Sequence, residues 1–220
     1  MTWTRTTARR SLRAGCALVA ALATALVAAP AADAQARTSA PTGTSSLAAL
    51  LARDGARFDH NPNDFDIADR AIRTVLAAKP TSAVAVLADG TVPLTAFLPN
   101  DRAFRRLAAD LTGKSYASEA RVLNTLATSL GVDTIESVLL YHVVPGATIT
   151  YRQALRSDGA TLGTALAGST IRVDVVRGHR VKLVDADRND ANPYVVRRNL
   201  NRGNVQIAHG ISQVLRPVNL

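Results

Sequence analysis

The four histidines are the first residues to consider for catalysis or metal binding, because an imidazole can act as a general base or as a ligand. They are His60, His142, His179 and His209. No two of them have the i, i+4 spacing of a helix or the i, i+2 spacing of a strand, so the sequence preassembles no metal site. We predict that His60 and His179 are exposed loop residues, whereas His142 and His209 require a separate interpretation.

An acidic segment, Asp185-x-Asp187-x-Asn189, resembles the beginning of a calcium-binding loop, in which alternate side chains supply oxygen ligands. The resemblance ends there, because Asp190 replaces the glycine of the sharp turn and Val196 replaces the bidentate glutamate. We interpret the segment as a solvated hairpin loop and predict no metal and no cofactor for the chain.

Sequence signatures of common enzyme classes are missing. The chain has no Gly-x-Ser-x-Gly elbow, no His-Glu-x-x-His helix, no Cys-x-x-Cys pair and no Gly-x-Gly-x-x-Gly turn. Gly113-Lys114-Ser115 imitates the end of a phosphate-binding loop, but Ala108 stands five residues earlier, so we interpret Gly113 as a helix C-cap. We predict no enzymatic activity and no catalytic residues.

Arginine supplies most of the positive charge that a partner would meet. The dense clusters are Arg102/Arg105/Arg106, Arg177/Arg180/Lys182 and Arg197/Arg198/Arg202. We predict partner contacts through the last cluster, Arg197, Arg198 and Arg202, which lies just before the final strands. The alternative is that all these arginines are solvated surface charge, because no aromatic residues interleave with them.

Residues 1–36 have the pattern of a cleavable secretory signal peptide. Four arginines precede the uncharged run Cys16–Pro30, which is too short and too rich in alanine for a stable membrane span. Small residues permit cleavage after Ala34 or after Ala36, and the Arg9-Arg10 pair leaves twin-arginine export open as an alternative. We expect a secreted, extracellular protein of the medium, periplasm or cell wall, with no membrane span after cleavage.

Composition limits the partners and the means of stabilisation. Removing residues 1–36 takes four arginines and Asp33 from 26 Lys and Arg and 17 Asp and Glu, which leaves 22 against 16 and a formal charge of +6. In an exported chain this excess favours anionic surface polymers over nucleic acid. The single cysteine is removed with the signal, so packing rather than a disulfide must stabilise the mature chain.

Hydrophobic spacing predicts helices first and strands later. Residues 37–63 are expected to be a flexible spacer with a short helix near Ser46–Arg57, and residues 64–218 to be the folded domain. Helices are expected over Asp66–Ala78, from the capping residue Asn100 to Gly113, over Ser118–Leu130 and over Asp133–Tyr141.

Strands are expected over Val84–Leu87, Leu94–Leu98, Ala147–Thr150, Ala160–Leu166, Ile171–Val175, Val181–Asp185 and Val205–Ala208. Helices and strands do not alternate regularly, which favours an α+β domain with helices packed on an antiparallel β-sandwich. The chain is expected to be a monomer by default.

Three segments resemble motifs of fasciclin domains. The first, Leu94-Thr-Ala-Phe-Leu-Pro-Asn-Asp-Arg-Ala-Phe104, matches the family's strand–proline–cap–helix pattern at Phe97, Pro99, Ala103 and Phe104, with Asn100 as the cap. The second, Leu139–Gly146, resembles the family's Tyr-His motif at Tyr141 and His142. The third runs from Gly203 to Pro217 and is similar to the family's ending at His209, Ile211, Val214, Leu215 and Pro217, with Ser212 in place of the usual Asp.

This resemblance covers about residues 64–217 and implies a single fasciclin-like domain of bacterial type, used outside the cell for adhesion or matrix binding without enzymatic activity. In animal members the Tyr-His region has been linked to receptor binding, so Tyr141 and His142 join the predicted partner contacts. The expected partner is a cell-surface or matrix protein or an anionic glycan.

Other functions compete with adhesion. One alternative is an exported enzyme or small-ligand carrier with a pocket near His142 and His209, and another is a purely structural envelope protein. The motif residues themselves can serve the fold, because Pro99 and Asn100 set a helix start while both histidines can anchor turns through hydrogen bonds.

Overall fold

The computed structural model describes residues 41–54, 57–59 and 61–220, which belong to a unit over Ser39–Leu220. The predicted signal peptide, both cleavage sites and His60 lie outside the described residues. Within the described ranges, no helix combines the length and the apolar character needed to span a membrane.

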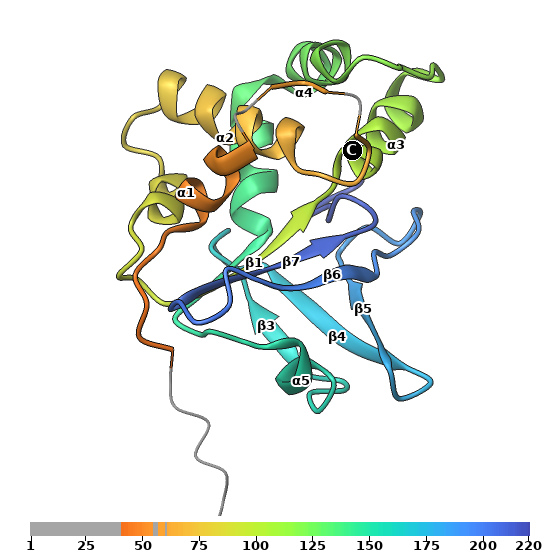
Figure 1. The fold of residues 1–220 in the computed structure, drawn as a ribbon. Helices are drawn as coiled ribbons and strands as arrows, with labels where there is room; N and C mark the ends of the chain where they lie inside the picture. The colour runs from red at the N-terminus through yellow and green to blue at the C-terminus, as the bar shows by residue number, and fades with distance from the viewer. Residues whose placement is uncertain (1–40, 55–56, 60) are drawn as a thin grey trace, which may run out of the picture. The chain divides into compact units, whose positions relative to one another are not determined.

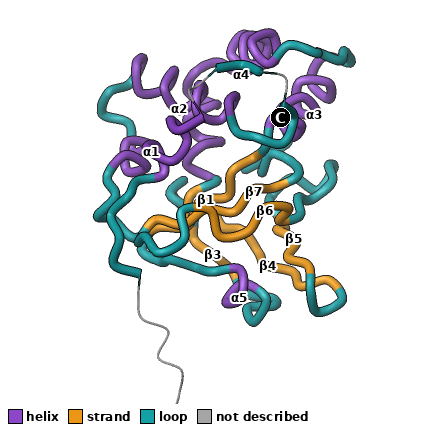
Figure 2. The backbone as a smooth tube through the Cα atoms, viewed as in Figure 1, coloured by secondary structure: helices purple, strands orange, loops and turns teal. Residues whose placement is uncertain are grey.

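Helices α1 to α4 gather at one end of the unit and the strands at the other (Figure 1; Figure 2). The helices are α1 (Leu47–Leu51), α2 (Asp66–Ala78), α3 (Asp101–Thr112), α4 (Glu119–Tyr141) and α5 (Tyr151–Ala154), with 3-10 helices η1 (Ala52–Asp54) and η2 (Ala83–Ala88). The strands are β1 (Leu94–Pro99), β2 (Val143–Pro145), β3 (Thr161–Gly163), β4 (Thr170–Val176), β5 (Arg180–Val184), β6 (Val195–Leu200) and β7 (Gln206–Ile211).

The strands form two sheets, one with the order β2-β1-β7-β6 and one with the order β3-β4-β5. The α+β class is confirmed. Strands β1 and β7 are parallel, with Phe97 opposite His209, and the other pairs are antiparallel. The expectation of purely antiparallel pairing is therefore wrong at this pair. A parallel pair needs a long crossover, which the helices and the second sheet supply here.

Strand β1 is buried on both faces and separates two hydrophobic cores. On one face Leu94, Ala96 and Leu98 pack with the helices, and on the other Phe97 packs with the second sheet. Successive side chains of a strand point to opposite faces, so a continuous apolar run is what a strand between two cores requires.

Helix α3, which begins in the first motif, and helix α4 begin and end close to the residues that the sequence predicts. The Asn100 side chain accepts a hydrogen bond from the Ala103 N–H at 3.0 Å, and Gly113, with φ of 68°, ends α3. Gly131, whose φ of 76° and ψ of 165° are not helical, divides α4 into two helical parts, which match the two helices expected over Ser118–Leu130 and Asp133–Tyr141.

Two strand predictions are wrong, and one observed strand was not predicted. Val84–Leu87 lies in the 3-10 helix η2, because a short apolar run cannot distinguish a strand from a buried helical turn. Ala147–Thr150 is not a strand, since the Thr95 hydroxyl, rather than a ladder partner, accepts the Ile149 N–H at 2.8 Å. Strand β6 was not expected, because its polar sequence lacks the alternation of a half-buried strand.

The expectation of a flexible spacer is wrong for the part of residues 37–63 that the structure places against the domain. Leu47 and Leu51 of α1 are buried in the helical core. The Leu47 N–H donates to the buried Gln206 side chain at 2.8 Å, and the Gly43 N–H donates to the Gly203 carbonyl at 3.0 Å. These contacts place Gly43, Leu47 and Leu51 against the rest of the domain, and the contact of Leu47 is with the last strand.

The interruption at Gly131 predicts a glycine requirement. Gly131→Ala should lower the free energy of unfolding by about 1–3 kcal/mol, because only glycine readily adopts this backbone conformation. Gly163→Ala is the matched control, since a Cβ at Gly163 would meet no atom within 4 Å. Urea unfolding measures both. Equal stability of the two variants would contradict the prediction.

Candidate binding surface

The structure buries the two Tyr-His residues that were predicted to contact a partner. Tyr141 is 0% exposed and His142 is 3% exposed, at the end of α4 where it meets the sheets. The Tyr141 hydroxyl donates to the Thr170 carbonyl at 2.9 Å and accepts the Ala186 N–H at 3.1 Å. Neither side chain can reach a partner while the domain is folded, so the prediction of direct contact is wrong.

Both ring nitrogens of His142 have backbone partners. Nδ1 lies 2.6 Å from the Val138 carbonyl, and Nε2 accepts the Leu215 N–H at 2.9 Å. These partners require a neutral ring with its proton on Nδ1. Burial lowers the pKa of His142 from 6.5 to about 4, which matches that assignment. His142 therefore connects the end of α4 to the C-terminal segment.

His209 is bound in the same way on β7. Its Nε2 lies 2.9 Å from the Ile149 carbonyl, and its Nδ1 accepts the Asn199 N–H at 3.2 Å. Its ring stacks on Phe97 with centroids 6.0 Å apart, and burial lowers its pKa. His209 therefore joins β7 to β6 and to the segment before α5.

The cavities beside these rings are small. The one lined in part by His142 has a volume of about 40 Å³, and the one lined in part by His209 about 20 Å³. Ligand pockets usually measure roughly 300–1,000 Å³. The described residues therefore do not support the alternative of a ligand or substrate pocket at the two histidines.

The other matching residues of the first and third fasciclin motifs also belong to the hydrophobic cores or their edges. Eight of them are buried and Pro217 is half-buried. The buried residues are Phe97, Pro99, Asn100, Ala103, Phe104, Ile211, Val214 and Leu215.

The acidic segment over residues 185–190 contacts the guanidinium of Arg216. Arg216 Nη2 lies 2.7 Å from Asp110, Nη1 lies 3.6 Å from Asp187, and Nη1 also contacts Asp190. The Arg216 N–H donates to Asp185 at 2.9 Å. Arg216 is itself buried, so this loop serves to compensate an internal cation and to hold the C-terminal segment against α3.

The predicted arginine contacts divide between two faces. Arg197 and Arg198 are neighbours on β6 and point to opposite sides. The Arg197 guanidinium lies 5.4 Å from the Phe65 ring, whereas that of Arg198 lies 4.2 Å from the Tyr151 ring. Arg202 is exposed in the turn before β7. Of these three arginines, Arg197 lines a depression of the surface.

This depression, which we call the arginine depression, has a volume of about 420 Å³ and is open to solvent. Its lining consists of Asn63, Asn100, Arg102, Arg106, Val196, Arg197 and Ser212. Arg102 and Arg106 are exposed residues of α3 one turn apart. Arg106 Nη1 donates to the Ser212 carbonyl at 3.0 Å, which holds that guanidinium at the wall. Arg105 turns inward instead and pairs with Glu119 at 2.7 Å.

Two features make the depression suitable for anions. Three arginine residues line it, and a guanidinium can donate two parallel hydrogen bonds to a carboxylate, phosphate or sulfate. The lining contains no carboxylate, histidine or cysteine that could neutralise the charge or perform acid–base chemistry. The charge of Arg102 and Arg106 is evident from the sequence, but local spacing cannot associate it with Arg197, which lies about 90 residues later.

The fold and this surface define an α+β domain in which the histidine motifs are structural and an open, basic depression faces solvent. The fasciclin domain model matches residues 71–217, so the chain belongs to the fasciclin domain family, as its motifs predicted. No curated protein matches the chain. A solved structure that is similar is a FAS1 domain pair from the insect cell adhesion molecule Fasciclin I, with 18% sequence identity and a TM-score of 0.49. The match covers 70% of this chain and 48% of that one, so the chain spans about half the length of the domain pair.

The buried histidine predicts that acid destabilises the domain. The unfolded chain protonates His142 near pH 6.5, whereas the folded chain does so only near pH 4. The unfolded state therefore binds more protons between these values, and stability falls as the pH decreases through them. We expect His142 to account for about 2 kcal/mol of this loss between pH 7 and pH 5.

Urea unfolding at the two pH values tests this, with His142→Gln compared against the wild type. The variant should be less stable at pH 7 but should lose less stability on acidification. His179→Gln is the control, because His179 is exposed, and it should retain the wild-type pH dependence. An unchanged pH dependence in His142→Gln would refute the assignment.

Proposed function

We propose that this chain is an exported adhesion-type module, without enzymatic activity, that binds an anionic glycan of the cell envelope or matrix through the arginine depression. Export rests on the signal-peptide pattern of residues 1–36. An adhesion role is supported by membership in the fasciclin domain family and by the fold's occurrence in an insect cell adhesion molecule.

The observation that carries the proposal is the convergence of Arg102, Arg106 and Arg197 on one open surface. An extended anionic polymer can place successive charges against such a surface, whereas a small substrate would remain exposed to water. Val196, which is 51% exposed at the same place, adds an apolar contact for a sugar ring. The expected affinity is moderate and dependent on salt, because exposed charges are screened.

The arginines also have a defined orientation. Arg197 lies against the Phe65 ring, which in turn occupies the space that Gly210 leaves, since a Cβ at Gly210 would come within 2.9 Å of that ring. Arg106 is held by the Ser212 carbonyl. A guanidinium that is already oriented loses less conformational entropy when it binds, which favours recognition over diffuse attraction.

Binding to heparin and polygalacturonate, which carry sulfate and carboxylate groups, tests the proposal at low and at moderate salt. Arg102→Gln/Arg106→Gln should weaken binding by about tenfold or more at low salt, because two of the three converging charges are removed. Ser212→Asp should weaken binding similarly by placing a carboxylate in the depression.

The matched control is Arg152→Gln/Arg156→Gln, which removes the same charge from two exposed residues, one in α5 and one just after it. We expect a change of no more than about threefold from this control, because only the long-range field differs. Equal losses in the two double variants would show that net charge alone attracts the polymer and would contradict the proposed site.

A further inference from the structure

A second depression of the surface adjoins the arginine depression, and the two share Arg197. This depression, which we call the leucine depression, has a volume of about 250 Å³ and is open to solvent. Its lining includes Leu50, Arg53, Phe65, Asp66, Arg197 and Leu200. It lies outside the site proposed above, which uses the arginine depression alone.

Two separate segments of the chain pass from one depression into the other. Strand β6 contributes Val196 to the arginine depression, Leu200 to the leucine depression and Arg197 to both. The segment that leads into α2 does the same, because Asn63 lines the arginine depression and Phe65 lines the leucine depression. The two depressions are therefore neighbours on one surface, and an extended polymer can cross from one to the other.

The Arg197 side chain lies at the boundary between the two depressions. Its guanidinium carbon is 5.4 Å from the centre of the Phe65 ring, and its Nη1 donates to the Asn63 carbonyl at 3.5 Å. A guanidinium has five N–H groups, so Arg197 can keep this contact and still donate to a ligand in either depression. One side chain can thus serve two neighbouring units of a polymer.

The leucine depression has an apolar wall that the arginine depression lacks. Leu50, Phe65 and Leu200 are half-buried and pack against the helical core, so their remaining surface faces the opening. Arg53 is exposed at the same place and supplies hydrogen-bond donors. This combination suits a group that is partly apolar and that also accepts hydrogen bonds.

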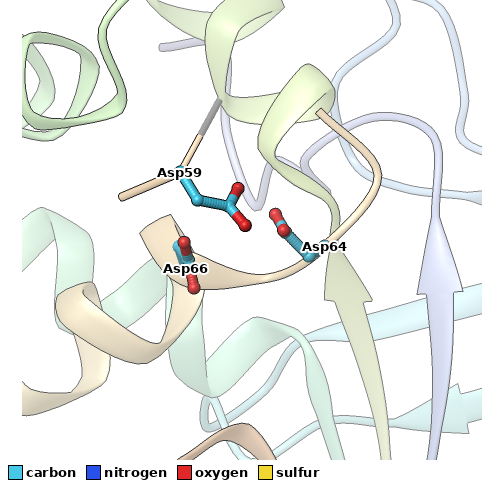
Figure 3. Close-up of side chains that lie close together, drawn as sticks. All are labelled: Asp59, Asp64 and Asp66. Carbon is cyan, nitrogen blue, oxygen red and sulfur yellow. The ribbon is translucent and has the colours of Figure 1, made fainter. Parts of the chain in front are cut away.

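The leucine depression also differs in charge, because a carboxylate belongs to its lining. Asp66 lies at the start of α2, close to Asp59 and Asp64 (Figure 3), and one carboxylate oxygen of each lies within 4.8 Å of the others. A second anionic group placed here would approach Asp66, whereas the lining of the arginine depression contains no carboxylate. Like charges at short range disfavour binding, so the leucine depression favours a neutral group.

We propose that the glycan is one in which acidic sugars alternate with neutral N-acetylated sugars, and that the leucine depression binds the N-acetylated sugar. This inference rests on the function proposed above. The acidic sugar pairs with the guanidinium groups of the arginine depression. The neighbouring acetamido group has a methyl group for Leu50 and Leu200, a carbonyl that accepts from Arg53, and no charge to meet Asp66.

Calorimetric titration of the mature chain at low salt compares two probes of equal length, a hyaluronan hexasaccharide and hexagalacturonate. The first alternates glucuronate with N-acetylglucosamine, and the second has a carboxylate on every sugar. We expect the hyaluronan hexasaccharide to bind roughly fivefold more tightly, although it carries half the charge, because only its neutral sugar fits the leucine depression. Attraction by net charge alone predicts the opposite order.

Variants of the leucine depression make this result specific. Leu50→Gln removes apolar contact without changing the charge, and should weaken binding of the hyaluronan hexasaccharide roughly fivefold while changing that of hexagalacturonate less than about twofold. Ala49→Gln is the matched control, because Ala49 is an exposed residue of the same helix outside the lining. Arg53→Gln, at an exposed position, should weaken hexasaccharide binding roughly threefold and tests the same depression if Leu50→Gln lowers the Tm.

Tighter binding of hexagalacturonate by the wild type would overturn this inference. Unchanged affinity for the hyaluronan hexasaccharide in both Leu50→Gln and Arg53→Gln would also overturn it, because the leucine depression would then not contact the ligand. Both outcomes leave the arginine depression in place as the binding site. That site fails on a different result, equal losses in Arg102→Gln/Arg106→Gln and in Arg152→Gln/Arg156→Gln, so the two failures are distinguishable.

Discussion

The parallel pairing of β1 with β7 is the interaction on which the rest of the structure depends. It places the first fasciclin motif beside the last, with Phe97 opposite His209. Strand β1 is buried on both faces, so the helices pack on one side of the pair and the second sheet on the other. Two hydrophobic cores are thus built on a single pair of strands, and the single cysteine of the chain leaves it no disulfide of its own.

The two buried histidines stabilise the surroundings of this pair. His142 connects the end of α4 to Leu215, and His209 connects β7 to the segments around Ile149 and Asn199. Each ring satisfies backbone groups that no regular ladder reaches, which is why a neutral imidazole with one donor and one acceptor suits these positions. The residues that look most reactive in the sequence are therefore parts of the scaffold.

Charge is divided between the surface and the interior near the start of α3. Arg102 and Arg106 line the arginine depression, whereas Asp101 is buried and Arg105 pairs with the buried Glu119. Helical geometry separates these neighbours, since successive residues lie about 100° apart around the axis. One turn of helix thereby presents a basic surface to solvent and contributes charged side chains to the interior.

Local sequence determined the elements whose signals are local. Asn100 and Gly113 bound α3 as their cap preferences require, Gly131 interrupts α4, and the three motifs predicted the fasciclin family. The second and third strands of the smaller sheet were also expected, because their apolar residues alternate clearly. These features depend on residues within a few positions of one another, so a linear sequence contains the information.

Tertiary structure decided what depends on distant residues. Only the fold shows that Tyr141 and His142 are buried, that Leu47 packs beside Gln206, and that β1 and β7 run parallel. It also divides the predicted cluster of Arg197, Arg198 and Arg202, and brings Arg197 to the arginines of α3. The carboxylates of Asp66, Asp101 and Glu119 meet for the same reason. Burial and proximity arise when separate segments pack together, and the spacing of residues along one segment cannot specify them.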